Sequence, residues 1–419
     1  MSSLDVKYKQ INKTKNEIVF DIEGDKKNGL DKSIPNSLRR NLLTRIESIS
    51  LIPENIIINV NNTSMHNEFL KDRLSLIPLY IDPETYENDY LFELNIKNTD
   101  NPILEVTTEN FNIYPINEHS KFLIQKQKDM DFIPDDKNIF MKMKENPKEY
   151  FNMDEPLNKA QKNKIINPLE HKGKKYYILI TELKLTNSDS DIEEINLYSI
   201  PVKGIGLQHA RFNNIPKSIS TFKIDNKLVD QEFKKYVKLN KIPAKNKPSR
   251  EKTFKIEHSE RYYYRDILQE PYYYEFTIKS NHIYNPSKLY TLSIDILIND
   301  FIELKNKLNK INKVEDYTTA TIENIKPNIF KLKINNEDHN TISILQSYAS
   351  RYFIDSESFI LVLGYTKYHP LETIMILNIM IKENDYEEIQ QITYILEFIN
   401  SVIDNINQDL NILKNKWNL

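Results

Sequence analysis

The chain has 419 residues, of which 39% are hydrophobic and 28% charged, which is the usage of folded globular domains. Its 57 basic and 60 acidic residues leave a formal net charge of −3, so the chain as a whole has no attraction to phosphate backbones. The absence of cysteine excludes disulfides, thiolate nucleophiles and thiolate-bound zinc. No apolar run approaches the roughly 18 residues of a membrane span, and the N-terminus lacks the apolar core of a signal peptide. We therefore expect an intracellular protein of two or three domains.

A strand and an amphipathic helix are predicted near the N-terminus. Residues 17–23 alternate apolar and polar, as in a half-buried strand. Ser33 is a residue type that favours the helix N-cap, and Pro35 suits the first turn. One face of this helix repeats every four residues, with Ile34, Leu38, Leu42 and Ile46. The other face carries Arg39, Arg40 and Arg45.

The following stretch alternates between short predicted elements and polar connections. Residues 55–60 indicate a strand, and 69–77 a short helix that ends before a proline. Residues 118–175 are polar and lysine-rich, so we expect irregular structure there. Residues 176–185 indicate another strand, and 244–252 an exposed connection.

The first half ends in the clearest helix of the chain. Asn285 and Pro286 provide an N-cap and a first-turn proline. The apolar residues that follow keep a heptad spacing, with Tyr290, Ile294, Leu297, Phe301, Leu304, Leu308 and Ile311. Polar residues and a proline then break the period, so we predict an interdomain linker at 312–328.

The second half repeats the plan of the first. Residues 330–334 alternate as a strand, 342–352 indicate an amphipathic helix, and two strands flank a turn at 368–371. A helix is predicted over 385–417, with a heptad face of Ile392, Ile395, Ile399, Val402 and Ile406 followed by Leu410, Leu413 and Trp417. Each copy has more apolar surface than it can bury alone, so we expect the two copies to pack together.

Motifs of catalysis or cofactor binding are weak. Gly204 and Gly206 lack the third glycine of a dinucleotide loop, and no P-loop is present. His66 and Glu68 form the start of a zinc-deaminase motif, but that chemistry requires cysteine ligands. We therefore expect no catalytic residues, no metal and no cofactor.

Two features leave a nucleic-acid interpretation open. Tyrosine triplets at 262–264 and 272–274 could stack on bases, although aromatics also favour paired strands of a hairpin, which we prefer. The lysine-rich segment 234–252 could contact a phosphate backbone, with a solvated loop as the default. The alternative function is thus a free-standing nucleic-acid-binding protein that uses tyrosine clusters and basic loops.

The first half resembles a known family. Residues 33–79 contain PNSLRR, then NTS, then HNEFLKDRLSLIPL, an order found in the third-largest subunit of eukaryotic RNA polymerase II and the archaeal D subunit. Residues 201–212, PVKGIGLQHARF, resemble a further segment of that family.

The second half resembles the partner subunit in the same enzymes, the eleventh subunit of polymerase II and archaeal L. The matching segments are NEDHNTISIL at 336–345 and GYTKYHPLE at 364–372. Ser343 stands where that family has glycine, and Tyr368 where it has proline, so these turns are expected to differ locally. Fused versions of the two subunits occur in large cytoplasmic DNA viruses, which is the source that the resemblance favours.

The resemblance implies an α+β fold of two alpha-type dimerisation modules, each with an antiparallel sheet and long heptad helices, packed as an intramolecular pseudo-dimer. The first module would comprise residues 1–53 and 251–311, interrupted by a mainly β domain at 54–250. The linker at 312–328 would lead to the second module at 329–419.

The resemblance also implies a function, a non-catalytic scaffold that nucleates assembly of the two largest polymerase subunits. Partners would be those subunits, the second-largest especially, and small assembly subunits of the tenth-subunit type, with DNA and RNA contacted only indirectly. One copy per polymerase is expected, located in the virion and the host cytoplasm if the source is viral and otherwise in the nucleus or cytoplasm, and not secreted. The docking residues would be Arg39, Arg40, His66, Glu68 and Arg73. The intramolecular interface would contain Leu38, Leu42, Leu297, Phe301, Leu304, Leu308, Leu345, Tyr348, Ile395, Ile399, Val402 and Ile406.

Overall fold

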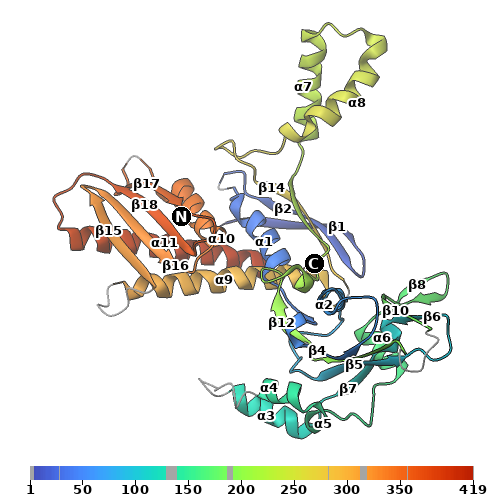
Figure 1. Ribbon diagram of the computed structural model, residues 1–419. Helices are drawn as coiled ribbons and strands as arrows, with labels where there is room; N and C mark the ends of the chain where they lie inside the picture. Colours follow the sequence, from blue (N-terminus) through green and yellow to red (C-terminus); the bar gives the residue numbers. More distant parts are fainter. Residues whose placement is uncertain are drawn as a thin grey trace. The chain divides into compact units, whose positions relative to one another are not determined.

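The computed structural model describes residues 4–27, 29–128, 139–185, 192–281, 283–311, 319–355 and 357–418 (Figure 1). The protein is mixed α and β, and its sheets are antiparallel. It forms two compact units. The discontinuous unit comprises Met1–Arg45 and Ile215–Leu419, and the inserted unit comprises Ile46–Asn214.

The discontinuous unit begins with a four-stranded sheet of order β1-β2-β14-β13. Helix α1 follows the first hairpin, and helix α9 follows β14. The elements are β1 (Val6–Lys13), β2 (Glu17–Gly24), α1 (Ser33–Thr44), β13 (Lys217–Phe222), β14 (Tyr273–Lys279) and α9 (Pro286–Lys310).

The second half of the discontinuous unit has the same succession of elements. Its sheet has the order β15-β16-β18-β17, so each strand occupies the place of its counterpart in the first sheet. The elements are β15 (Ala320–Lys326), β16 (Ile329–Asn335), α10 (His339–Tyr348), β17 (Ile360–Thr366), β18 (Ile374–Ile381) and α11 (Glu388–Lys416). A π-helical turn, η8 (Ala349–Phe353), extends α10.

The alternation seen in the sequence produces the buried sheet faces. In β2, Ile18, Phe20 and Ile22 are at most 1% exposed, and in β16 the equivalent residues Phe330, Leu332 and Ile334 are fully buried. These faces pack under the helices because successive side chains of a strand point to opposite sides.

The two outer strands carry matching irregularities. The register of β1 shifts between Gln10 and Asn12, and that of β15 shifts between Asn324 and Lys326. The residues skipped are Ile11 and Ile325, which are 46% and 45% exposed. Bulges of this kind interrupt the regular hydrogen-bonding edge of a strand, which discourages edge-to-edge pairing with another chain.

The two halves differ in what is inserted between corresponding elements. The first half contains the inserted unit between α1 and β13, and a helical hairpin between β13 and β14. The hairpin consists of α7 (Asn226–Leu239) and α8 (Lys247–His258), where the second half has only a short turn. The connection predicted at 244–252 is exposed as expected, but it is helical and not an irregular loop.

The predicted bounds of the insertion and the linker also need correction. The inserted unit spans 46–214 and not 54–250, because β13 pairs with β14 and so returns the chain to the first sheet. Within the predicted linker 312–328, residues 320–326 form β15, paired with β16. Residues 312–318 lie outside the described part of the chain.

The inserted unit is built on a four-stranded sheet, β4-β11-β5-β7, with three two-stranded pairs beside it, β10-β6, β12-β3 and β8-β9. The strands are β3 (Glu47–Ser50), β4 (Ile56–Asn61), β5 (Tyr90–Lys97), β6 (Ile103–Thr107), β7 (Asn112–Pro115), β8 (Leu169–His171), β9 (Lys174–Tyr176), β10 (Leu179–Lys184), β11 (Glu194–Ser199) and β12 (Val202–Ile205). Helix α2 (Asn67–Ser75) packs Leu70 and Leu74 into its core.

The polar segment 118–175 is not irregular throughout. It contains α3 (Glu118–Lys128), α4 (Ile139–Glu145), α5 (Pro147–Tyr150) and α6 (Lys159–Ile165). A few apolar residues hold the first three helices, since Ile124, Met143 and Phe151 are buried in one cluster, while Ile165 of α6 joins the main core of the inserted unit. Irregular structure was predicted because most residues of the segment are polar and the few apolar residues are widely spaced.

Candidate functional site

The residues predicted for the intramolecular interface lie on four helices of the discontinuous unit, α1, α9, α10 and α11. All twelve are at most 2% exposed: Leu38, Leu42, Leu297, Phe301, Leu304, Leu308, Leu345, Tyr348, Ile395, Ile399, Val402 and Ile406. Helix α1 contacts α9 and α10, and α9 contacts α11. The two halves of the unit thus share one helical core.

Polar pairs fix the register of α9 against α11. Lys414 Nζ lies 2.6 Å from Asp295 Oδ1, and Lys305 Nζ lies 2.5 Å from Asp404 Oδ1. The residue nearer the start of α9, Asp295, pairs with the residue nearer the end of α11, Lys414, so the helices are antiparallel. Figure 1 shows them side by side. The pairs flank the apolar seam and select one alignment of the two helices.

A buried amide pair links α1 to α10. The Asn340 side-chain amide donates to Asn41 Oδ1 over 2.8 Å, and the Asn41 amide donates to the carbonyl of Ser293 on α9 over 3.5 Å. Asn41 is 1% exposed and Asn340 is 5% exposed. A buried amide without a hydrogen-bond partner destabilises the fold, so this chain of hydrogen bonds favours one arrangement of the three helices.

The C-terminal end of α11 packs against the first sheet through Trp417. Its ring centroid lies 4.4 Å from that of Tyr290 and 4.6 Å from that of Phe20. The indole N–H donates to the carbonyl of Ser287 over 3.2 Å. The last helix of the chain is thereby attached to the core of the first half.

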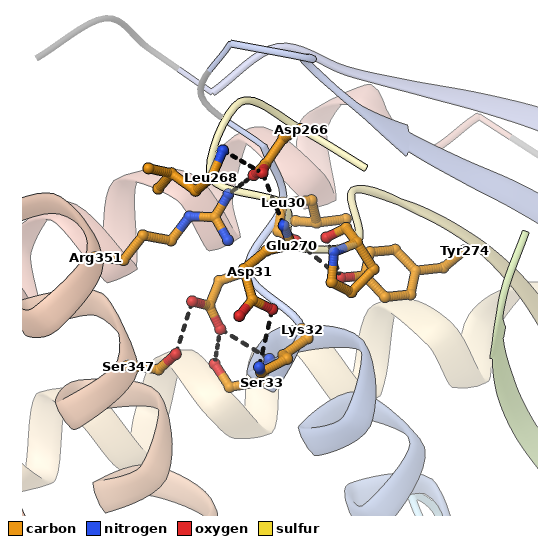
Figure 2. Close-up of polar contacts among 11 residues, drawn as sticks. Leu30, Asp31, Lys32, Ser33, Asp266, Leu268, Glu270, Tyr274, Ser347 and Arg351 are labelled. Carbon is orange, nitrogen blue, oxygen red and sulfur yellow. Dashed lines mark hydrogen bonds and ion pairs between the residues drawn. The ribbon is translucent and has the colours of Figure 1, made fainter. Parts of the chain in front are cut away.

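Asp31, in the loop before α1, organises a second polar link between the halves (Figure 2). Its Oδ1 accepts from the backbone N–H of Ser33 at 2.8 Å and from the Ser33 hydroxyl at 2.5 Å. Its Oδ2 accepts from the Ser347 hydroxyl on α10 at 2.7 Å. The prediction that Ser33 caps α1 is wrong, because Ser33 is the first helical residue and Asp31 receives its N–H.

A buried ion pair lies beside Asp31. Arg351, on η8, pairs with Asp266 in the loop before β14, and their side chains are 7% and 0% exposed. Asp266 also accepts from the backbone N–H groups of Leu268 and Glu270 at 2.8 and 3.0 Å (Figure 2). Gly29 permits this approach, because a Cβ there would lie 2.0 Å from Arg351 Nη2.

The acid Asp409, on α11, is half-buried and contacts α10. The Tyr348 hydroxyl donates to Asp409 Oδ2 over 3.0 Å. Burial raises the pKa of Asp409 to about 6, although the Tyr348 hydroxyl and the backbone N–H of Leu4 act to lower it. Ionisation of this carboxyl is therefore coupled to the packing of the helices.

The docking residues predicted on α1 face outward. Arg40 is exposed, while Arg39 is half-buried and donates from Nη2 to Asn36 Oδ1 over 2.9 Å. Arg45 turns to the core side, where it pairs with Asp300 of α9 at 2.8 Å. Of these arginines, Arg40 is thus the most accessible to a partner.

The docking residues predicted on α2 are exposed at its surface. His66 caps the helix, since its Nδ1 accepts from the N–H of Glu68 over 3.3 Å. Glu68 and Arg73 are exposed. Phe69 and Leu76 are 72% and 62% exposed, so this helix presents apolar as well as charged groups to solvent. Phe69 therefore does not face the core.

The tyrosine triplets do not form the paired strands that were predicted. Residues 272–274 lead into β14, but 262–264 make only an isolated bridge, between Tyr263 and Ile224. The rings are engaged in packing, with Tyr262 stacked on Phe254 at 6.2 Å. A continuous stacking platform for bases is therefore not formed by these residues.

Within the described ranges, no three His, Asp or Glu side chains gather in a way that could hold a metal ion. In the same part of the chain, no helix combines the length and apolarity needed to cross a membrane. No model of a known protein family matches the chain, and no curated protein matches its sequence. The interpretation of function therefore rests on the fold and on the sequence motifs.

The residues that sequence reasoning missed are the polar links between the halves: Asp31, Asn41, Asp266, Asn340, Ser347, Arg351 and Asp409. Asp31 had one usable signal, an acidic residue two positions before a serine at a helix start, which is the pattern of a side chain that accepts backbone N–H groups. The others had none, since their partners are distant along the chain.

Proposed function

We propose that this chain is a non-catalytic assembly scaffold of a DNA-directed RNA polymerase, in which two alpha-like modules form an intramolecular pseudo-dimer. The observation that carries the proposal is the correspondence of the two sheets, β1-β2-β14-β13 and β15-β16-β18-β17, each followed by a long helix of the shared core. This is the arrangement that the resemblance of the motifs to the third and eleventh polymerase subunits leads one to expect.

The pseudo-dimer leaves its outer surfaces for other subunits. Helices α1, α9, α10 and α11 bury their apolar faces against one another, so the exposed residues of α1 remain for docking, and the inserted unit adds the exposed residues of α2. In the proposed enzyme these surfaces bind the two largest, catalytic subunits, with the second-largest on α1, and small assembly subunits of the tenth-subunit type. The chain itself contributes no chemistry to nucleotide addition.

Affinity purification of the tagged full chain from the cells in which it is expressed, followed by mass spectrometry, tests this proposal. Recovery of two very large polymerase subunits at equal stoichiometry is the expected result. Recovery of the chain without any polymerase subunit, under conditions that preserve other large complexes, would contradict it.

The Arg40→Ala variant tests the docking surface. Arg40 is exposed and its side chain makes no ion pair within the described part of the chain, so its removal should leave the melting temperature unchanged. We expect the affinity for the second-largest subunit, and with it the recovery of that subunit, to fall about tenfold. Such a fall corresponds to a loss of about 1.4 kcal/mol of binding free energy, which is typical for the removal of one interface arginine. Lys13→Ala, an exposed change on β1, is the matched control. Equal recovery with both variants would place the docking surface elsewhere.

A further inference from the structure

The helical hairpin between β13 and β14 has a small core of its own. Val229 and Phe233 of α7 pack against Phe254 of α8, and all three are at most 8% exposed. Tyr236 lies over the same ring, with centroids 5.1 Å apart. At about 1.5 Å per residue, the 14 residues of α7 extend roughly 21 Å from the sheet end of the hairpin to its turn.

The turn end of the hairpin concentrates positive charge. Residues 234–252 contain seven lysines and one arginine against a single glutamate, a net charge of +7 in a chain whose overall charge is −3. All eight basic side chains are exposed: Lys234, Lys235, Lys238, Lys241, Lys245, Lys247, Arg250 and Lys252. We call this surface the basic tip.

Few of these charges are neutralised within the protein. Lys235 pairs with Glu232 at 2.6 Å. The one acid of the tip, Glu251, pairs at 2.7 Å with Lys255, which lies outside the tip. In the described part of the chain, the other seven basic residues of the tip make no ion pair, so their positive potential extends into solvent.

The turn itself places a lysine where the backbone favours glycine. Lys241 follows α7 with φ of 49°. The N–H of Ile242 bonds the carbonyl of Val237 at 3.1 Å, and the N–H of Lys241 bonds that of Lys238 at 3.4 Å, which is the Schellman pattern of helix termination. A lysine at this left-handed position adds charge to the tip at the expense of backbone preference.

We propose that the basic tip binds the phosphate backbone of a double-stranded nucleic acid without regard to sequence. Seven of its eight basic residues are lysines, which act as point charges and lack the fork with which arginine reads guanine. The tip also offers no free aromatic face, since Phe233 and Phe254 are buried and Tyr236 is half-buried between them. Single strands are usually held by such faces, so the tip fits a duplex.

An acidic protein is a poorer fit to the same surface. Protein interfaces are enriched in aromatic residues and arginine, and depleted in lysine. The basic tip has the opposite composition. The inference goes beyond the proposed scaffold function, because it assigns direct backbone contact to an insertion that has no counterpart in the second half of the unit.

Fluorescence anisotropy with the full chain tests the inference. The probes are a 20-base-pair DNA duplex and an RNA duplex of the same sequence, each titrated at several salt concentrations. We expect binding that weakens steeply with salt and does not change when the sequence is scrambled. Binding to both duplexes, or to one alone, identifies which backbone the tip accepts.

The decisive variant replaces Lys234, Lys238 and Lys241 with glutamine. Glutamine keeps the helix propensity and the strain at position 241 while removing three charges. The slope of log affinity against log salt should fall by about 2.7, since each lost phosphate contact contributes about 0.9. The matched control replaces three exposed lysines of β1, Lys7, Lys9 and Lys13, with glutamine and should keep the wild-type slope.

Three outcomes would overturn the inference. They are no duplex binding by the wild-type chain at 50 mM salt, an equal loss in the two triple variants, and binding to vesicles containing anionic lipid with none to either duplex. If the triple variant unfolds the hairpin, the single variant Lys238→Gln replaces it, with an expected slope change of about 0.9. Because these measurements use the isolated chain, their failure leaves the scaffold proposal untouched, and the reverse also holds.

Discussion

At the scale of single residues, the contacts that join the two halves are polar groups inside an apolar core. Asn41 and Asn340 meet at 2.8 Å, Asp31 reaches Ser347 at 2.7 Å, and Asp409 accepts from the backbone N–H of Leu4. Such groups contribute little net stability, but an unpaired one costs about 1 to 3 kcal/mol. They therefore act mainly by excluding other alignments of the same apolar helices.

The half-buried carboxyl of Asp409 should make the stability of the fold depend on pH. Its folded pKa of about 6 exceeds the roughly 3.9 of an unfolded aspartate, so the folded state binds the proton more tightly. The stabilisation that comes from this tighter proton binding is fully present below about pH 4 and is lost as the pH rises through 6. Asp409→Asn should therefore be more stable than the wild-type protein above pH 6, by no more than about 2 kcal/mol once solvent screening is allowed for, and should converge with it near pH 4.

Chemical denaturation at pH 4 to 8 measures this difference. The control is Asp404→Asn on the exposed face of the same helix, where loss of the pair with Lys305 should cost about 0.5 kcal/mol or less. An Asp409→Asn curve parallel to that of the wild-type protein over this range would contradict the assignment.

At the scale of elements, the helical hairpin shows how a local pattern can mislead. Residues 234–252 have the lysines and prolines of a solvated loop. Two helices form nevertheless, because Val229, Phe233 and Tyr236, which share one face of α7, pack against Phe254 of α8. Pro248 is tolerated because it lies in the first turn of α8, where a missing N–H costs nothing. A solvated loop was predicted there from amino-acid composition, which does not include the packing between the two helices.

Replacement of Lys241 with glycine separates charge from backbone strain at the hairpin turn. Glycine adopts φ of 49° freely, so local stability should rise by about 1 kcal/mol while duplex affinity falls. Native-state hydrogen exchange of the α7 amides measures the local stability. Lys238→Gly, inside the helix, is the matched control and should lower local stability by about 1 kcal/mol. Equal shifts in both variants would show that position 241 is not strained.

At the scale of the whole molecule, the fusion of two corresponding halves makes their association intramolecular. A covalent connection of suitable length holds partners at an effective concentration of about millimolar, so the proposed pseudo-dimer would form irrespective of dilution. The shared core of α1, α9, α10 and α11 is mostly apolar, and its buried polar side chains include Ser37, Asn41, Ser293, Asn340 and Thr341. Its burial should hold the halves together even without the covalent connection.

Cleavage of the linker tests the strength of this interface. A protease site is placed between residues 312 and 318, and the cut protein is diluted to nanomolar concentration. We expect the fragments to remain associated in size-exclusion chromatography, because an interface of this apolar character belongs to the obligate class. Separation at nanomolar concentration would mean that the fusion, and not the interface, keeps the halves together.

Local patterns in the sequence determined the helices and strands whose apolar faces are formed by residues close together in the chain. The alternation at 17–23 became β2, the Asn285 side chain caps α9 as predicted, and the heptad pattern after residue 385, which contains no glycine or proline, became α11. The repeated order of elements was also visible, because each apolar period is written in consecutive residues.

Tertiary structure decided everything that depends on partners far apart in the chain. Sparse apolar residues stabilised helices at 118–128, 139–145, 147–150 and 159–165. Pairing with β16 made a strand of part of the predicted linker, and pairing with β14 placed β13 outside the inserted unit. The bonds of Asp31 with Ser347 and of Asp266 with Arg351 have no local signature, since each partner is a common surface residue until packing buries it. Burial, which makes these polar contacts selective, is a property of the assembled fold and not of any segment.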